Sequence, residues 1–179
     1  IGHAIDYKTF YKKIDSFSKK DFAIVSRISK SKNIEESIEG FLNSSASKSS
    51  SILIIGGPLT NEDEVYYEYL LNIYKDHKNV SFIGPVPHSE LVNYLKNVSF
   101  HINNTDKGFY DKSVLETSVN GIINFYKNID YNKNIPSKYE ENLKFDGSPA
   151  DLSNKISSIF SLDQNEFLKI IETSQEKIK

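Results

Sequence analysis

Ile52-Leu-Ile-Ile-Gly-Gly-Pro58 is a run of four large apolar residues that ends in two glycines and a proline. A short run of this kind, apolar throughout, is typical of a strand that is buried on both faces, as strands of parallel sheets are. The Gly-Gly-Pro sequence then ends the strand and turns the chain toward a helix. The run therefore predicts a buried strand of a parallel sheet with a tight loop at its carboxyl end.

The same alternation extends in both directions along the chain. Short apolar runs are separated by segments whose apolar residues recur at the spacing of one helix face. The predicted strands are 22–25, 52–55, 80–83, 98–102, 122–125 and 143–145. Repeated strand–helix units of this length imply right-handed crossovers between parallel strands. The sequence therefore predicts an α/β fold, a doubly wound parallel sheet with helices on both faces.

Helix start signals lie between these strands. An Asn, Ser, Thr or Asp followed three residues later by an acidic residue is typical of a helix N-terminus. Such pairs are Asn33 with Glu36, Thr60 with Asp63, Ser148 with Asp151, and Asp163 with Glu166. The helix that begins at Thr60 is expected to bury Val65, Tyr69, Leu70 and Ile73. Another helix is expected to begin near Ser113, and residues 126–142 are interpreted as a polar loop.

The chain has 179 residues, enough for one α/β domain with a sizeable core. It begins Ile-Gly-His-Ala and contains no methionine, which suggests a piece of a longer protein. Residues 1–20 are interpreted as an interdomain segment anchored by Tyr7 and Phe10, and residues 21–179 as the domain itself. Ligands of such sheets bind at the carboxyl ends of the strands, so the site is expected there.

Composition excludes several classes of function. The formal net charge is −2, with 22 basic and 24 acidic residues mixed along the chain, so no basic face for nucleic acid is expected. Without cysteine there is no disulfide or thiolate metal site, and the four histidines have no metal-ligand spacing. No apolar run approaches the roughly 20 residues that a membrane-spanning helix needs.

Two cations follow the first predicted strand, just before a helix N-terminus. Arg27 is the only arginine among the 22 basic residues, and Lys32 comes five residues later. A lone arginine in a lysine-rich chain suggests a role that lysine cannot fill, such as forked hydrogen bonding to phosphate. Together with the helix N-terminus, these cations could bind a diphosphate. The alternative is that both are solvated loop charges.

A second candidate site follows the fourth predicted strand. A loop with one glycine, Gly108, leads into the helix that carries Glu116. Free backbone N–H groups at such a helix start could bind a phosphate, and a carboxylate one turn further could bind the two hydroxyls of a ribose. The alternative, which the sequence alone favours, is that Glu116 only offsets the helix dipole.

Taken together, these segments resemble the C-terminal domain of glycosyltransferase family 4, a GT-B family whose domains have Rossmann-like folds. The likeness spans nearly the whole chain and rests on five pieces in the same order as in the family. They are Gly2 to Asp6 followed by Phe10, Val25-Ser26-Arg27 with Lys32, Ile54 to Pro58, Asn79 to Gly84 followed by His88 and Leu91, and Val114-Leu115-Glu116 followed by Gly121.

The resemblance implies a role for each matching residue. Arg27 and Lys32 would hold the diphosphate of a nucleotide-sugar donor and stabilise the charge of the leaving nucleotide. Glu116 would accept hydrogen bonds from the ribose. The base would be contacted by Gly84 and Val86. The phosphates would be bound by Lys112, Ser113 and Val114, mainly through backbone N–H groups.

One position departs from the family pattern. The family has two glutamates eight positions apart, of which the first often contacts the transferred sugar, and here Gly108 stands in its place. Asp106 and Asp111 are the two carboxylates in the same loop that could substitute for it. The loss of this glutamate keeps open a relative that binds nucleotide without catalysis.

The resemblance therefore implies the donor-binding half of a retaining glycosyltransferase. It would use a UDP-, GDP- or ADP-sugar without a bound metal, and the acceptor, a glycan or a lipid, would be bound through an N-terminal domain outside this chain. The isolated domain is expected to be inactive, and the protein to be cytoplasmic, with peripheral membrane contact of the full-length protein left open. The alternatives are the non-catalytic relative and a sugar-nucleotide epimerase of the same fold.

Overall fold

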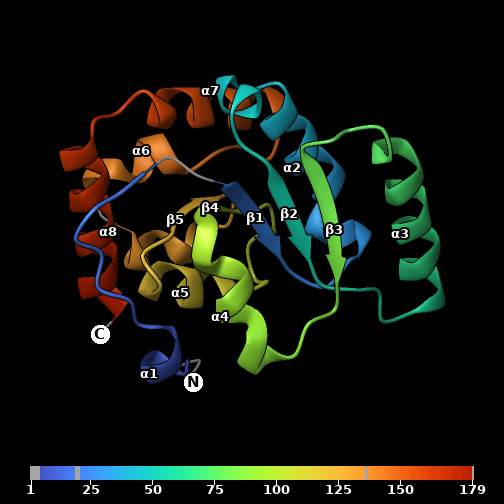
Figure 1. Ribbon diagram of the computed structural model, residues 1–179, viewed down its shortest axis with the longest axis horizontal. Coiled ribbons are helices and arrows are strands. Elements are labelled where there is room, and N and C mark those ends of the chain that lie inside the picture. Colours follow the sequence, from blue (N-terminus) through green and yellow to red (C-terminus); the bar gives the residue numbers. More distant parts are fainter. Residues whose placement is uncertain (1–4, 19–20, 136, 179) are drawn as a thin grey trace.

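The structure, a computed structural model, describes residues 5–18, 21–135 and 137–178. Within this part of the chain, five strands form one parallel sheet in the order β3-β2-β1-β4-β5 (Figure 1). The strands are β1 Asp21–Val25, β2 Ile52–Ile55, β3 Val80–Gly84, β4 Val98–Asn103 and β5 Ile123–Tyr126. The predicted fold class is confirmed. After β3 the chain returns to the other side of β1, so the topological switch point lies between β1 and β4.

Helices cover both faces of this sheet. They are α1 Tyr7–Phe10, α2 Ile34–Leu42, α3 Asn61–Tyr74, α4 Leu91–Tyr94, α5 Lys112–Val119, α6 Glu140–Leu143, α7 Pro149–Phe160 and α8 Gln164–Ile178. Helices α2, α3, α7 and α8 contribute to the larger apolar cluster, and α1, α4 and α5 to the smaller one on the opposite face. Figure 1 shows α3 beside β3 and α8 near the other end of the sheet.

The strands alternate between these two clusters because successive side chains of a strand point to opposite faces. In β1, Phe22 and Ile24 belong to the larger cluster, while Ala23 belongs to the smaller one. Phe22 stacks on Phe100 of the neighbouring β4 with ring centroids 4.7 Å apart, and both side chains are fully buried. β4 and β5 are buried along their whole length, as their apolar runs predict, whereas the edge strand β3 is only half-buried.

Most of the predicted helix starts are confirmed. The backbone N–H groups of Asp63, Asp151 and Glu166 donate to the side chains of Thr60, Ser148 and Asp163 respectively. Asn33 is different: its backbone is left-handed, with φ 47°, and its side chain does not cap α2. Instead its Nδ2 donates to the carbonyl of Asn104, which ties the start of α2 to the loop after β4.

The predicted inward face of α3 is wrong in part. Leu70 is buried and Ile73 is half-buried, but Val65 and Tyr69 are 72% and 46% exposed. The buried stripe is carried instead by Tyr66 and Tyr74. Their hydroxyls hydrogen-bond the backbone of Glu35 in α2, so these tyrosines bury their rings and still satisfy their polar ends. Burial raises the pKa of Tyr66 to about 12.

The predicted sixth strand, 143–145, is also wrong. Leu143 is the last residue of α6, and this segment meets the sheet only in a single bridge between Lys144 and Tyr126. The Lys144 N–H donates to the Glu140 carbonyl in a helical turn, which leaves too few extended residues for a strand. Residues 126–142, interpreted from sequence as a polar loop, contain α6 and two 3-10 helices, Ile129–Asn134 and Ser137–Tyr139.

The segment before β1 packs against the domain. Phe10 is fully buried, as predicted for an anchor, and Tyr7 is half-buried. Lys12 N–H donates to the carbonyl of Val119 at the end of α5. The Gly2-His3-Ala4 part of the proposed interdomain match lies outside the described residues.

A buried histidine joins β4 to its neighbours. The backbone N–H of Val25 donates to Nε2 of His101 at 3.3 Å, so the proton of the neutral ring is on Nδ1, which donates to Asn124 at 2.7 Å. Asn124 also accepts from Thr117 and donates to Ser118 of α5. Burial lowers the pKa of His101 to about 4, although the Asn124 hydrogen bond opposes that shift.

This histidine predicts a dependence of stability on pH. In the unfolded chain the pKa of His101 returns to about 6.5, so below that pH the unfolded state binds more protons than the folded state. The free energy of unfolding should therefore fall by about 3 kcal/mol for this group as the pH drops from 6.5 to 4. His101→Gln, which does not titrate, should show a shallower fall in urea unfolding at several pH values. His77→Gln, at an exposed histidine, is the control, and equal slopes for all three proteins would contradict the prediction.

Candidate functional site

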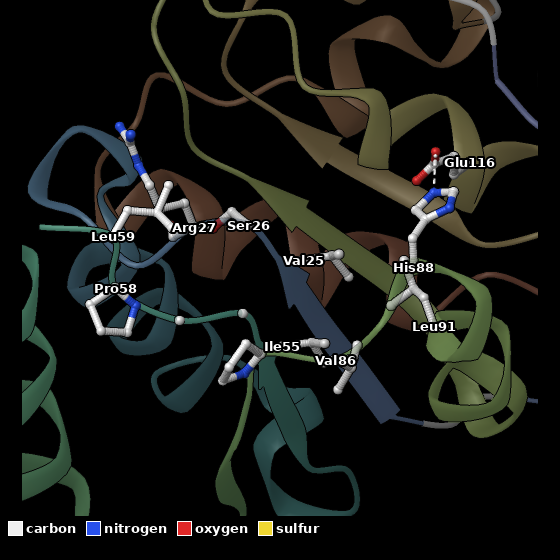
Figure 2. A pocket seen from close by; sticks show the side chains of 13 residues that line it. Val25, Ser26, Arg27, Ile55, Pro58, Leu59, Val86, His88, Leu91 and Glu116 are labelled. Carbon is white, nitrogen blue, oxygen red and sulfur yellow. Dashed lines mark hydrogen bonds and ion pairs between the residues drawn. The ribbon is translucent and has the colours of Figure 1, made fainter.

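A pocket of ≈ 330 Å³ lies at the carboxyl ends of β1, β2 and β3 (Figure 2). Val25 and Ile55, the last residues of β1 and β2, line it together with Val86 and Leu91 from the chain after β3. These four side chains give the pocket an apolar part that could hold a flat ring. The position agrees with the expectation that ligands bind beside the carboxyl ends of the strands.

Glycines bring the loops of this pocket close together. Gly56 has φ 141°, and a Cβ at this position would lie 1.8 Å from the carbonyl oxygen of Ser26. The loops after β1 and β2 therefore touch through their backbones. Gly57 is less crowded, since a Cβ there would lie 3.1 Å from the ring of Pro85.

A carboxylate stands at one end of the pocket. Glu116 lies in the second turn of α5 and is only 4% exposed. Its Oε1 is 2.9 Å from Nε2 of His88, which follows β3 and whose side chain is 61% exposed (Figure 2). The His88 ring packs on Phe10 of α1, with 5.2 Å between the ring centroids.

The arginine stands at the other end of the pocket. Arg27 lies in the loop after β1 and is exposed, and Figure 2 shows its guanidinium directed away from Glu116. No ion pair of Arg27 is formed with another described residue. The guanidinium is therefore available to an anionic ligand from solvent.

Lys32 does not line this pocket but is held by a carboxylate. Its Nζ lies 2.7 and 2.9 Å from the two carboxylate oxygens of Asp111, and its side chain is 10% exposed. Asp111 is held in turn, since it accepts from Asn103 of β4 and its backbone N–H donates to the Tyr131 hydroxyl. The second predicted phosphate-binding cation is thus neutralised in this structure.

The first turn of α5 lies beside that ion pair. Asp111 is its N-cap residue, but because its carboxylate faces Lys32 it makes no capping hydrogen bond. Lys112, Ser113 and Val114 follow, and the buried Ser113 hydroxyl has no hydrogen-bond partner among the described residues. An uncapped helix start of this kind retains donors for an anion.

The structure therefore places the predicted site residues in two adjoining groups. Arg27, Val86 and Glu116 line one pocket, whereas Lys32 meets the start of α5 through Asp111. Gly84 is the last residue of β3 and has φ 81°, which turns the chain toward Val86. No contact of His88 with Glu116 was predicted from the sequence, because nothing in its spacing indicates a carboxylate partner 28 positions away.

The structure also separates the two loop carboxylates. Asp106 pairs with Lys127 at 2.6 Å and is largely exposed, while Asp111 pairs with the predicted site residue Lys32. Gly108, at the position of the family's first glutamate, donates its N–H to Asp130. Of the two, Asp111 is the carboxylate adjacent to the predicted diphosphate position.

Among the described residues, no three histidine, aspartate or glutamate side chains are grouped as a metal site. None of the helices in this part of the chain has the length and apolar character that crossing a bilayer requires.

Several solved glycosyltransferase structures are similar to this one. The catalytic domain of cholesterol-α-glucosyltransferase from Helicobacter pylori has a TM-score of 0.73 and 19% identity, covering 90% of this chain and 98% of that one. The C-terminal domain of a group 1 family glycosyl transferase, LpcC from Francisella tularensis, has a TM-score of 0.77 and 18% identity, with 98% and 96% covered. Anabaena HepE in complex with UDP-glucose has a TM-score of 0.79 and 14% identity, with 97% and 50% covered.

At these identities the likeness shows the fold, which is that of the C-terminal domain of GT-B glycosyltransferases. The chain spans nearly all of the first two structures and half of HepE. No protein-family model matches the sequence, and no curated protein matches it.

The close approach at Gly56 predicts a stability effect. Gly56→Ala forces the loops after β1 and β2 apart and should lower the free energy of unfolding by roughly 3 kcal/mol or more. Gly108→Ala is the matched control: it also has a positive φ, 93°, but no atom lies within 4 Å of the added Cβ. It should cost roughly 1–2 kcal/mol from backbone conformation alone. Urea unfolding measures both, and equal losses would show that the loop contact is unimportant.

Proposed function

We propose that this chain is the donor-binding domain of a retaining glycosyltransferase related to family 4. It would bind a UDP-, GDP- or ADP-sugar whose sugar passes to a glycan or lipid acceptor. The observation that carries the proposal is that Arg27, Val86 and Glu116, far apart in the sequence, line one pocket at the carboxyl edge of the sheet. The GT-B fold of similar glycosyltransferases supports it.

Each group in the pocket has chemistry that suits one part of a nucleotide sugar. The apolar residues around Val86 would contact the base, next to the turn at Gly84. Glu116 would accept hydrogen bonds from ribose hydroxyls, since a carboxylate offers two acceptor oxygens. Arg27 is exposed and would pair with the diphosphate through its forked donors.

The diphosphate would also draw Lys32 and the start of α5. The backbone N–H groups of Lys112, Ser113 and Val114 would face the phosphates, as at other uncapped helix starts. Positive charge placed there stabilises the nucleotide diphosphate as it leaves, without any proton transfer. Arg27 and Lys32 would thereby fill the electrostatic role that a metal ion has in other enzymes.

To bind the diphosphate, the Lys32 ammonium group must exchange its present partner, the Asp111 carboxylate, for a phosphate. Its partner Asp111 is a carboxylate at the position where the diphosphate would bind, so the two anions compete for the ammonium group. Binding of a donor would therefore break or share the Lys32–Asp111 pair. The freed carboxylate would then be close to the transferred sugar, in the loop where Gly108 replaces the family's first glutamate.

UDP is the first nucleotide to test. HepE was crystallised with UDP-glucose, with UDP and glucose, and with UDP. The chain spans half of HepE, which fits a protein whose N-terminal domain binds the acceptor. Under this proposal the isolated domain binds nucleotide weakly and transfers nothing, and the full-length enzyme acts in the cytoplasm, where nucleotide sugars are its donors.

One observation favours a second candidate function, binding of nucleotide without catalysis. Gly108 leaves the sugar position without the usual glutamate, and its N–H is already bonded to Asp130. Sugar-nucleotide consumption by the full-length protein with acceptor separates an enzyme from such a module. Release of free nucleotide without acceptor would instead indicate an epimerase of this fold.

Nucleotide binding should depend on Arg27. UDP, GDP and ADP, followed by their sugar conjugates, are titrated into the domain by NMR. One nucleotide should give saturable shifts, and Arg27→Ala should weaken its binding about tenfold or more because a charge-assisted contact to phosphate is lost. Lys30→Ala, which removes an exposed lysine nearby, is the control and should bind within about twofold of wild type. Binding unchanged by Arg27→Ala would move the diphosphate away from β1.

Removing the carboxylate that pairs with Lys32 should strengthen nucleotide binding, the opposite of the effect of Arg27→Ala. Asp111→Asn removes the competing anion and should tighten UDP binding about three- to tenfold in the same titration. Lys32→Ala should weaken it. In the full-length enzyme Asp111→Asn should nevertheless lower sugar transfer if the carboxylate faces the sugar. Asp106→Asn is the matched control, since Asp106 pairs with Lys127 instead. Weaker UDP binding by Asp111→Asn, with an unchanged melting temperature, would refute the competition.

A further inference from the structure

His88 lies where three parts of the domain meet. It follows β3 at the start of a short 3-10 helix, its ring packs on Phe10 of α1, and its Nε2 reaches Glu116 of α5. The fully buried Phe10 packs against the imidazole, while the His88 side chain is otherwise 61% exposed. The contact with Phe10 and the hydrogen bond to Glu116 together hold the ring at this end of the pocket.

Glu116 depends on this histidine. The carboxylate is almost completely buried, and a buried charge requires hydrogen-bond partners. Among the described residues its only hydrogen-bond partner is His88, which contacts Oε1 at 2.9 Å. The other oxygen, Oε2, has no hydrogen bond within the described chain. A single partner thus selects the rotamer of the carboxylate and leaves one oxygen for a ligand.

We propose that His88 is a positioning residue for Glu116: the imidazole holds Oε1 so that Oε2 faces the ribose hydroxyls of the bound nucleotide. This inference rests on the proposed function, because it assigns Glu116 a ribose. Figure 2 shows the His88–Glu116 contact at the end of the pocket opposite Arg27, so the effect of His88 is confined to the nucleoside end.

The role predicts a loss that depends on the ribose. Without His88 the carboxylate is free to take other rotamers, and hydrogen bonds to the ribose are weakened while contacts to the base and diphosphate remain. His88→Ala should therefore weaken nucleotide binding about tenfold, and a nucleotide without ribose hydroxyls should bind both proteins equally. A purely structural role would weaken both nucleotides alike.

The experiment compares two forms of one nucleotide by isothermal titration. UDP, GDP and ADP are the probes, and the one that wild type binds most tightly is compared with its 2′,3′-dideoxy form. The variants are His88→Ala, Glu116→Gln and the double variant, with His77→Ala as a control at an exposed histidine. His88→Gln retains a side-chain N–H donor and should recover affinity to within about threefold of wild type. Melting temperatures establish that each variant is folded.

Four results bear on the inference. A loss in His88→Ala for the ribonucleotide alone, with the double variant no weaker than Glu116→Gln, would support it. Equal losses for both nucleotides would overturn it and indicate direct contact of His88 with the base or a structural role. Ribonucleotide binding unchanged in His88→Ala would overturn it while leaving the proposed function intact. If wild type binds none of the three nucleotides, the proposed function fails and the inference fails with it.

Discussion

The hydrogen bond from the Val25 N–H to His101 joins β1 to β4 at the edge of the sheet where the candidate site lies. The paired register of β1 with β4 ends at Ala23, whereas its pairing with β2 continues to Val25. The last N–H on the β4 side would be unpaired inside the protein, and the His101 side chain accepts it. The strands can therefore separate at their carboxyl ends without leaving a buried donor unsatisfied. That separation occurs at the switch point, where a ligand crevice is expected.

The same histidine connects this edge to α5. His101 donates to Asn124, and Asn124 is bonded to Thr117 and Ser118 in the helix that carries Glu116. The carboxylate thus stands on a helix that is fixed to β4 and β5 by fully buried polar contacts. Such a network holds a functional side chain more rigidly than a loop would. Protonation of His101 would remove the acceptor for Val25 at the wall of the pocket itself.

How much of this was predictable depends on how far apart the interacting residues lie in the sequence. Each of the first five strands was visible as a local apolar run, whereas their order in the sheet came only from the structure. The inward face of α3 was predicted only in part, because tyrosine is common at protein surfaces. The structure shows that Tyr66 and Tyr74 are buried with their hydroxyls bonded to α2. The partners of the site residues were not predicted either, because they lie far from them in the sequence. Lys32 meets Asp111 across 79 positions, and no local pattern encodes such a pair.

Arg27 differs from Glu116 and Lys32, the other two charged residues of the proposed site. Glu116 is bonded to His88 and Lys32 is neutralised by Asp111, so of these three charged side chains only Arg27 has no ionic partner among the described residues. The attraction of the pocket for a diphosphate would then depend first on Arg27, whose guanidinium offers paired donors. A lysine at that position would supply the positive charge but not the paired N–H donors of a guanidinium. In a chain that uses lysine at 21 of its 22 basic positions, the one arginine stands where no other described side chain competes for it.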